Sequence, residues 1–187
     1  MGQRIELAEG VFIVRNLLRP QTCREYIELA EQIGFEEASL SLPGGALFRP
    51  DIRNNTRANL DSADHAEQLW CLSKAHVPPG PGRWRPAGLN ERLRFYRYES
   101  GEYFDWHYDG SFERSATEAS MWTFMVYLNS GFGGGETLFE GFEVLPETGL
   151  ALFFEHQRRH KGEQVMRGRK YVLRSDVMCR LAPDHRP

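Results

Sequence analysis

Three residues of this 187-residue chain could together hold a metal ion: His107, Asp109 and His160. Two imidazoles and one carboxylate can bind one face of an iron(II) ion and leave its other coordination positions open for small ligands. Lys170 follows ten residues after His160 and could bind an anionic ligand beside the metal. The pattern therefore predicts an iron centre with open positions.

The spacing of these residues indicates how they could meet. On a strand, residues i and i+2 point to the same face, so His107 and Asp109 could reach one ion while Tyr108 faces away. Gly110 follows, and we therefore expect Asp109 to end a strand. His160 is expected just beyond the end of a separate strand, Leu150–Phe154. A His-x-Asp triplet alone arises often by chance, so the context has to support it.

That context lies on two expected strands. Lys170 opens an apolar run, where an inward-pointing lysine is costly unless it is paired. Tyr127 lies in another such run and could donate its phenol hydrogen to the same ligand carboxylate. Taken singly, Lys170 could equally be exposed at a strand start, and Tyr127 could be an ordinary core aromatic.

The elements that must position these residues divide the chain near residue 89. The first half is predicted to hold a short strand, two helices and two turn-rich connections: strand Val11–Val14, helices Cys23–Ile33 (with Pro20 in its first turn) and Ala63–His76, and connections Leu42–Arg53 and Pro78–Gly88. We expect the first connection to be a mobile loop.

The second half alternates short apolar runs with turns, which is typical of a β-sandwich or barrel. The expected strands are Leu93–Tyr98, Thr123–Leu128, Thr137–Phe139, Leu150–Phe154 and Tyr171–Val177. Helices first and strands later predict a mainly β, α+β protein, a jelly roll with its N-terminal helices packed on one sheet. We expect one domain over 1–187, with 1–88 as helical support and substrate-side loops and 89–181 as the catalytic core.

Composition excludes several classes of protein. Hydrophobic residues make up 41% of the chain and aromatic residues 12%, which is enough for a packed core. A net charge of −3 argues against a general nucleic-acid binder. No apolar run approaches a membrane span, and the first residues lack a signal-peptide core. The 3 cysteines are widely spaced, so neither a disulfide framework nor a zinc knuckle is expected, and we expect a cytoplasmic setting.

From Asn90 to Cys179 the sequence resembles the catalytic domain of prolyl 4-hydroxylase-like, Fe(II)- and 2-oxoglutarate-dependent dioxygenases. The matching runs are RFYRYESGEYFDWHYD, TFMVYLN, GGGETLF, PETGLALFF and HKGEQVMRGRKYVLRSDVM. Their order and spacing agree with the family. The resemblance implies a double-stranded β-helix fold, Fe(II), 2-oxoglutarate as co-substrate, and ascorbate as a further ligand.

By the same resemblance, His107, Asp109 and His160 are iron ligands. Lys170 pairs with the C5 carboxylate of 2-oxoglutarate with Tyr127 beside it, and Tyr98 and Thr137 line the co-substrate pocket. A halogenating relative would lack the carboxylate ligand at the Asp109 position, so that a halide could bind there. The carboxylate therefore implies hydroxylation.

Two features depart from the family pattern. Gln164 stands where the family commonly has a proline. A second histidine, His156, precedes His160 by four residues, but only His160 has the ten-residue offset to Lys170. His156 is therefore predicted to be a surface or substrate-side residue.

Substrate recognition is expected in the first-half loops and beside the iron site, with Asn54, Asn55, Arg57 and Trp122 as the candidate substrate contacts. The resemblance implies O2 as a second co-substrate and a peptidyl proline as the substrate. One alternative is hydroxylation of a free amino acid or other small metabolite. A less favoured one is oxidative demethylation of a nucleic acid, because Arg174 and Arg180 have the six-residue spacing of the arginine pair in that branch. A metal-free binding module would require a broken triad, and all three ligand residues are present.

Overall fold

The computed structural model describes residues 2–38, 40–42, 45–47 and 49–183, and two antiparallel sheets dominate it. The larger sheet has the strand order β1-β2-β15-β11-β18-β8-β6-β3, with β10 beside β11 and β7 beside β18. Its strands are β1 (Gln3–Ala8), β2 (Val11–Arg15), β3 (Glu36–Glu37), β6 (Thr56–Asp61), β7 (Trp84–Leu89), β8 (Arg92–Tyr98), β10 (Glu113–Ser115), β11 (Glu118–Tyr127), β15 (Ala151–Glu155) and β18 (Lys170–Leu181).

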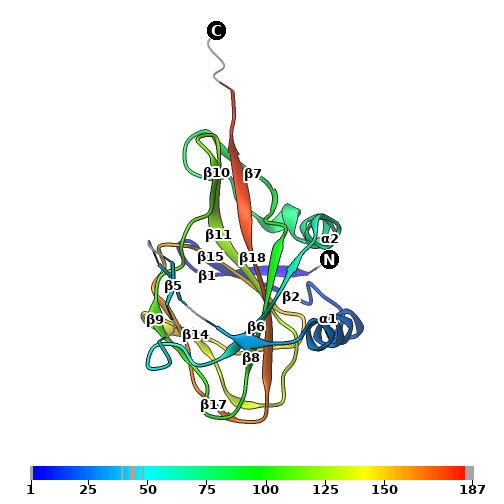
Figure 1. Ribbon diagram of the computed structural model, residues 1–187. Helices are drawn as coiled ribbons and strands as arrows, with labels where there is room; N and C mark the ends of the chain where they lie inside the picture. The colour runs from blue at the N-terminus through cyan, green and yellow to red at the C-terminus, as the bar shows by residue number, and fades with distance from the viewer. Residues whose placement is uncertain (1, 39, 43–44, 48, 184–187) are drawn as a thin grey trace.

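The smaller sheet has four strands in the order β14-β13-β16-β9, and the helices lie on the opposite side of the larger sheet (Figure 1). Its strands are β9 (Phe104–His107), β13 (Thr137–Phe139), β14 (Phe142–Val144) and β16 (His160–Gly162). The remaining elements are α1 (Pro20–Ile33), α2 (Ala63–Ser73), a 3-10 turn (Lys74–His76), and two strand pairs, β4 (Leu40–Leu42) with β5 (Gly45–Leu47) and β12 (Gly133–Gly134) with β17 (Val165–Arg167). This is the predicted jelly roll.

Alternation along the central strands separates two layers of the interior. On β11, Trp122 and Phe124 face the helices, whereas Met125 and Tyr127 face the smaller sheet. This is the two-residue period of a strand that is buried on both faces. The layer between the two sheets is the one that contains the candidate site.

Both predicted helices form, for the local reasons the sequence indicated. α1 begins with Pro20 and ends at Gly34, whose φ of 90° is costly for residues with a side chain. α2 begins after Ser62, whose hydroxyl oxygen accepts a hydrogen bond from the backbone N–H of His65. Tyr26 of α1 and Leu69 of α2 are buried where these helices pack against the larger sheet.

The first half of the chain contributes more strand than predicted. β1 was not expected, and the connection 78–88 contains most of β7. β5, which pairs with β4, lies within the expected loop 42–53. Residues 43, 44 and 48 of that loop lie outside the described residues. β2 and β6 pair with the second-half strands β15 and β8, so the larger sheet crosses the expected boundary near residue 89.

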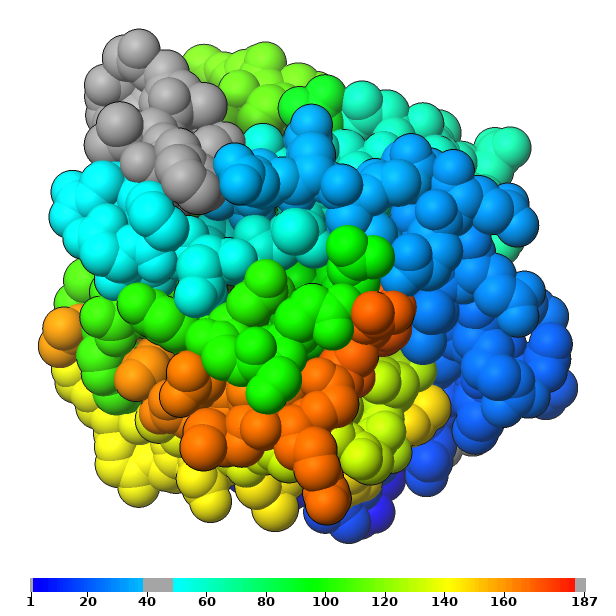
Figure 2. All heavy atoms as spheres, turned by 60° about the horizontal axis from the view of Figure 1, so that its bottom comes forward, coloured from blue at the N-terminus to red at the C-terminus, as the bar shows by residue number. Residues whose placement is uncertain are grey.

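Two turns close one end of the jelly roll, where β8 ends and β18 begins. The N–H of Gly101 donates to the carbonyl of Val165 over 2.8 Å, and the N–H of Val165 donates to that of Glu102 over 3.0 Å. Figure 2 looks onto this end, where the segment around residue 100 (green) lies against the segment around residue 165 (orange). No helix among the described residues is both long and apolar enough to cross a membrane.

Candidate active site

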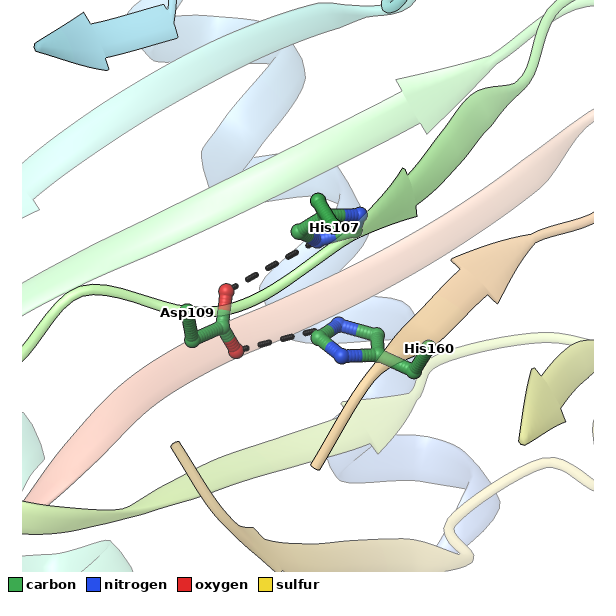
Figure 3. Close-up of side chains that lie close together, drawn as sticks. All are labelled: His107, Asp109 and His160. Carbon is green, nitrogen blue, oxygen red and sulfur yellow. Dashed lines mark ion pairs between the residues drawn. The ribbon is translucent and has the colours of Figure 1, made fainter. Parts of the chain in front are cut away.

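His107, Asp109 and His160 converge between the two sheets (Figure 3). Their candidate ligand atoms all lie within 4.8 Å of one another. The Oδ1 atom of Asp109 is 3.7 Å from Nε2 of His107, and its Oδ2 atom is 3.8 Å from Nε2 of His160. Two nitrogens and one oxygen so arranged could bind one face of an ion.

The structure differs from the expected positions of the ligands in two details. β9 ends at His107, so Asp109 lies in the following loop rather than on the strand. His160 does not follow directly from β15 but begins a separate strand, β16, which pairs with β9. His160 and His107 are direct cross-strand partners, and this register brings the two imidazoles together.

Backbone and side-chain hydrogen bonds orient each candidate ligand. Nδ1 of His107 lies 2.7 Å from the carbonyl oxygen of Asp105, and Nδ1 of His160 lies 3.0 Å from that of Arg158. A proton on each Nδ1 leaves Nε2 as a neutral electron-pair donor, which is how metal-bound histidines are usually held. The hydroxyl of Thr123 donates to Oδ2 of Asp109 over 2.6 Å.

The electrostatic surroundings favour the protonation states that a metal needs. Burial, together with the neighbouring His160, lowers the pKa of His107 to about 3. Burial acts to raise the pKa of Asp109, but Arg174 and the two histidines outweigh it and hold the pKa well below its usual value. The site therefore presents two neutral imidazoles and one carboxylate near neutral pH, a donor set that fits Fe(II).

Lys170 lies in the same cavity as the three candidate ligands. An inner cavity is lined by the triad together with Lys170, Tyr98 and Thr137. Lys170 is 2% exposed, its Nζ donates to the carbonyl of Gly135 over 2.7 Å, and no carboxylate within the described part of the chain forms an ion pair with it. A buried cation of this kind could bind a carboxylate that enters the cavity.

Tyr127 contributes to this cavity indirectly. Its hydroxyl donates to the Oγ1 atom of Thr137 over 2.6 Å, and its ring centre lies 5.6 Å from Nζ of Lys170. Tyr127 is completely buried and lies behind Thr137 rather than in the cavity lining. The structure thus places three of the four predicted co-substrate residues at the cavity wall and the fourth in support of Thr137.

Three of the four candidate substrate contacts do not reach the site. Trp122 packs against Phe12 on the helix side of β11, with ring centres 5.7 Å apart, because residues 122 and 123 point to opposite faces. The side chain of Asn54 accepts a hydrogen bond from the backbone N–H of Tyr103, and that of Asn55 accepts one from Arg53. These two asparagines stabilise the loop, and neither lines the cavities beside the triad.

Arg57, the fourth, does line a second, outer cavity that opens beside the triad. Arg53, Arg94 and Arg174 line it as well and were not predicted from the sequence as contacts. For Arg174 a signal was present: it lies four residues after Lys170 on one strand, so the two side chains share a face.

Arg174 and Arg180 lie in different surroundings. Nη2 of Arg174 lies 3.1 Å from Asp109 and 3.2 Å from Asp176 in the interior. Arg180 pairs with Glu118 at the surface, and six residues of strand separate the two arginines by about 20 Å. The prediction for His156 also needs correction, because His156 is buried and contacts the hydroxyls of Ser120 and Thr123 at 2.9 and 3.1 Å.

Residues 93–175 match the family model of the 2OG-Fe(II) oxygenase superfamily, a stretch that contains the triad and Lys170. This match agrees with the resemblance to Fe(II)- and 2-oxoglutarate-dependent oxygenases that was predicted from the sequence. The predicted Fe(II) and 2-oxoglutarate cofactors agree with that match, and the donor set of His107, Asp109 and His160 fits the metal.

Known proteins similar to this chain include several prolyl hydroxylases. A protein of Acanthamoeba polyphaga mimivirus named "Putative prolyl 4-hydroxylase" is 24% identical over 188 residues, which cover 86% of this chain and 71% of the viral protein. The viral collagen prolyl hydroxylase of Paramecium bursaria Chlorella virus-1, solved with 2-oxoglutarate, superposes with a TM-score of 0.63 at 20% identity, over 94% of this chain and 100% of that one.

Two cellular proteins share the same fold. A Pseudomonas putida prolyl-4-hydroxylase superposes with a TM-score of 0.66 at 17% identity, over 90% of this chain and 92% of that one. A Trichoplax adhaerens prolyl hydroxylase, solved with a peptide fragment of the hypoxia-inducible factor oxygen degradation domain, gives 0.66 at 16% identity over 90% and 83%. These similarities confirm the predicted double-stranded β-helix.

Proposed function

We propose that this oxygenase hydroxylates an unactivated C–H bond of a prolyl residue in a peptide or protein. In the balanced reaction, 2-oxoglutarate and O2 are converted to succinate and CO2, and the second oxygen atom enters the substrate as a hydroxyl. The observation that carries the proposal is the convergence of His107, Asp109 and His160 on one cavity with the buried Lys170. The prolyl hydroxylases among its relatives support the choice of substrate.

Each residue of the inner cavity has a separate task in this proposal. His107, Asp109 and His160 hold Fe(II), which supplies the oxidising chemistry when 2-oxoglutarate and O2 bind. Lys170 binds the C5 carboxylate of 2-oxoglutarate, while Tyr98 and Thr137 form the walls of its pocket. The closed turns at this end of the jelly roll keep water from that ion pair, which strengthens it.

A second candidate is hydroxylation of a free amino acid or another small metabolite. The outer cavity favours it, because four arginine side chains line the approach to the triad and could hold a small anion. Ascorbate, which would keep the iron reduced, belongs to either candidate, and its role is tested by adding it to the assay below.

The test is release of succinate from 2-oxoglutarate with Fe(II), measured for the wild type and for His107→Ala and Asp109→Ala. Prolyl peptides and free L-proline are compared as substrates. We expect succinate release in the wild type, a further increase with a prolyl peptide, and a loss of about 1,000-fold or more in either variant, since each removes a metal ligand. A wild type that neither binds Fe(II) nor releases succinate above the variants would refute the oxygenase function.

A further inference from the structure

Arginine side chains outnumber acidic ones in the outer cavity. Among the described residues, four arginines and two carboxylates line it: Arg53, Arg57, Arg94 and Arg174, with Asp109 and Asp176. Asp109 belongs to the metal triad. The cavity therefore has an excess of positive charge directly beside the site of oxidation.

Three of these arginines have acidic partners. Nη1 of Arg94 lies 3.0 Å from Asp176, and Arg174 contacts both Asp109 and Asp176. Nε of Arg57 lies 3.8 Å from the carboxylate of Glu36. For Arg53, no acidic partner is found among the described residues.

The side chain of Arg53 is buried and fixed by its neighbours. It is 5% exposed, and its Nε donates to Oδ1 of Asn55 over 2.7 Å. The guanidinium carbon lies 4.5 Å from the ring centres of both Tyr96 and Phe104. Over the described residues, Nη2 of Arg53 is buried without a hydrogen-bond partner, and no carboxylate forms an ion pair with the side chain.

The position of Arg53 relative to the triad is set by Phe104. The backbones of Arg53 and Phe104 form an isolated antiparallel bridge. The ring of Phe104 in turn stacks on the imidazole of His107, with centres 3.5 Å apart and planes 11° from parallel. A single aromatic ring therefore separates the guanidinium from a candidate iron ligand.

A buried cation without an anionic partner is costly, and an incoming anion removes that cost. The two rings lie over the guanidinium, so N–H donors directed along its plane are left for a ligand. A planar carboxylate matches such an edge with two parallel hydrogen bonds. The positive potential is also felt by Tyr96: burial would raise its pKa, but Arg174, Arg53 and Arg94 lower it to about 8.

We propose that the substrate of this oxygenase carries a carboxylate that binds Arg53 in the outer cavity and so directs a nearby C–H bond towards the triad. This inference rests on the proposed hydroxylase function and specifies its substrate. The carboxylate can come from a free amino acid or other small acid, or from the C-terminus or an acidic side chain of a peptide.

The experiment compares substrates that differ only in the carboxylate. The pairs are L-proline and L-prolinamide, a short peptide ending in proline with a free or amidated C-terminus, and a blocked peptide containing Pro-Glu or Pro-Gln. KM and kcat are measured by substrate-stimulated succinate release for the wild type, Arg53→Gln, Arg53→Lys and Arg92→Gln. Arg92 forms an exposed pair with Asp61, so Arg92→Gln is a matched loss of one surface arginine.

In the wild type we expect the acid of at least one pair to have a KM about 10- to 100-fold below that of its amide, the range of a charge-assisted pair. Which pair responds identifies the source of the carboxylate. Arg53→Gln should bring this ratio close to one, Arg53→Lys should keep part of it, and Arg92→Gln should leave it unchanged. The ratio compares two substrates on one enzyme, so it is insensitive to the fraction of a variant that is folded.

Two results would overturn the proposal while leaving the oxygenase function standing. In the first, the wild type releases succinate from 2-oxoglutarate, yet no acid outperforms its amide in any pair. In the second, Arg53→Gln retains the full preference for the acid. A wild type without Fe(II)-dependent turnover of 2-oxoglutarate would instead refute the oxygenase function itself.

Discussion

Replacing Lys170 by methionine should stabilise the ligand-free protein while removing its affinity for 2-oxoglutarate. Burial lowers the pKa of Lys170 from 10.5 to about 8. Each tenfold change in proton affinity corresponds to about 1.4 kcal/mol, so the folded protein holds this charge at a cost of about 3 kcal/mol. Methionine has a similar shape and needs no hydration.

The gain is reduced by one lost hydrogen bond. The Nζ atom of Lys170 donates to the carbonyl of Gly135, and such a bond contributes about 1 kcal/mol. The net change is then about 2 kcal/mol in favour of the folded Lys170→Met protein. For a chain of this length it corresponds to a rise in Tm of about 4–8 °C.

The effect on the ligand has the opposite sign. Removing one partner of a buried ion pair costs about 3–5 kcal/mol, so the Kd for 2-oxoglutarate should rise by more than about 100-fold. Tm is measured by circular dichroism on metal-free protein at pH 7, and Kd by calorimetry with Mn(II) in place of Fe(II). Lys74→Met removes an exposed lysine and should change neither quantity appreciably.

The same lysine predicts how binding depends on pH. Lys170 loses its charge as the pH rises through about 8, so the Kd of the wild type should increase about fivefold between pH 8 and pH 9. The stability of the ligand-free protein should change in the opposite direction, because the pKa of Lys170 is lower in the folded protein than its unfolded value of 10.5. Charged Lys170 therefore destabilises the fold most below pH 8. This destabilisation should disappear as the pH rises from 8 towards 10.5. A lower Tm for Lys170→Met together with an unchanged Kd would refute this reasoning.

Two further predictions concern ligand orientation and backbone geometry. Thr123→Val removes the hydroxyl that donates to Asp109, so the affinity for Fe(II) should fall by about 10- to 100-fold. Thr123→Ser keeps a hydroxyl and should keep the affinity. Equal affinities of the wild type and Thr123→Val in a metal titration would exclude a role of this hydroxyl in orienting Asp109. Gly149→Ala would place a Cβ 2.1 Å from the carbonyl oxygen of Leu18 at a φ of +82°, so it should lower the unfolding free energy by about 2 kcal/mol or more. Gly141→Ala, at a φ of +94° but in open space, should cost less in the same urea titration, and an equal cost would show that the overlap is relieved.

The regular parts of the fold could be predicted because local sequence determines them. Pro20 and Gly34 delimit α1, and the expected strand Thr137–Phe139 forms with the same bounds as β13. β1 and β7 were missed because polar and proline-containing strands form only through pairing with neighbours, which local propensity does not reveal.

Some features of the candidate site could likewise be predicted from the sequence, and others could not. Residue type and spacing along the chain were sufficient to identify the triad and Lys170, because metal ligation and carboxylate binding require particular donor atoms in a particular order. Residue type could not show that Trp122 faces the helices, since a shift of one residue along a strand reverses its face.

The sequence by itself therefore predicted the reaction class and the residues, His107, Asp109, His160 and Lys170, that the fold brings to one cavity. Only the tertiary structure revealed that Asn54 and Asn55 stabilise a loop and that His156 is buried. It also revealed that Arg53 lies one ring from His107, with no acidic partner among the described residues. Charge compensation depends on which side chains lie nearby in space, and the segments around Arg53 and Phe104 meet only when the chain has folded.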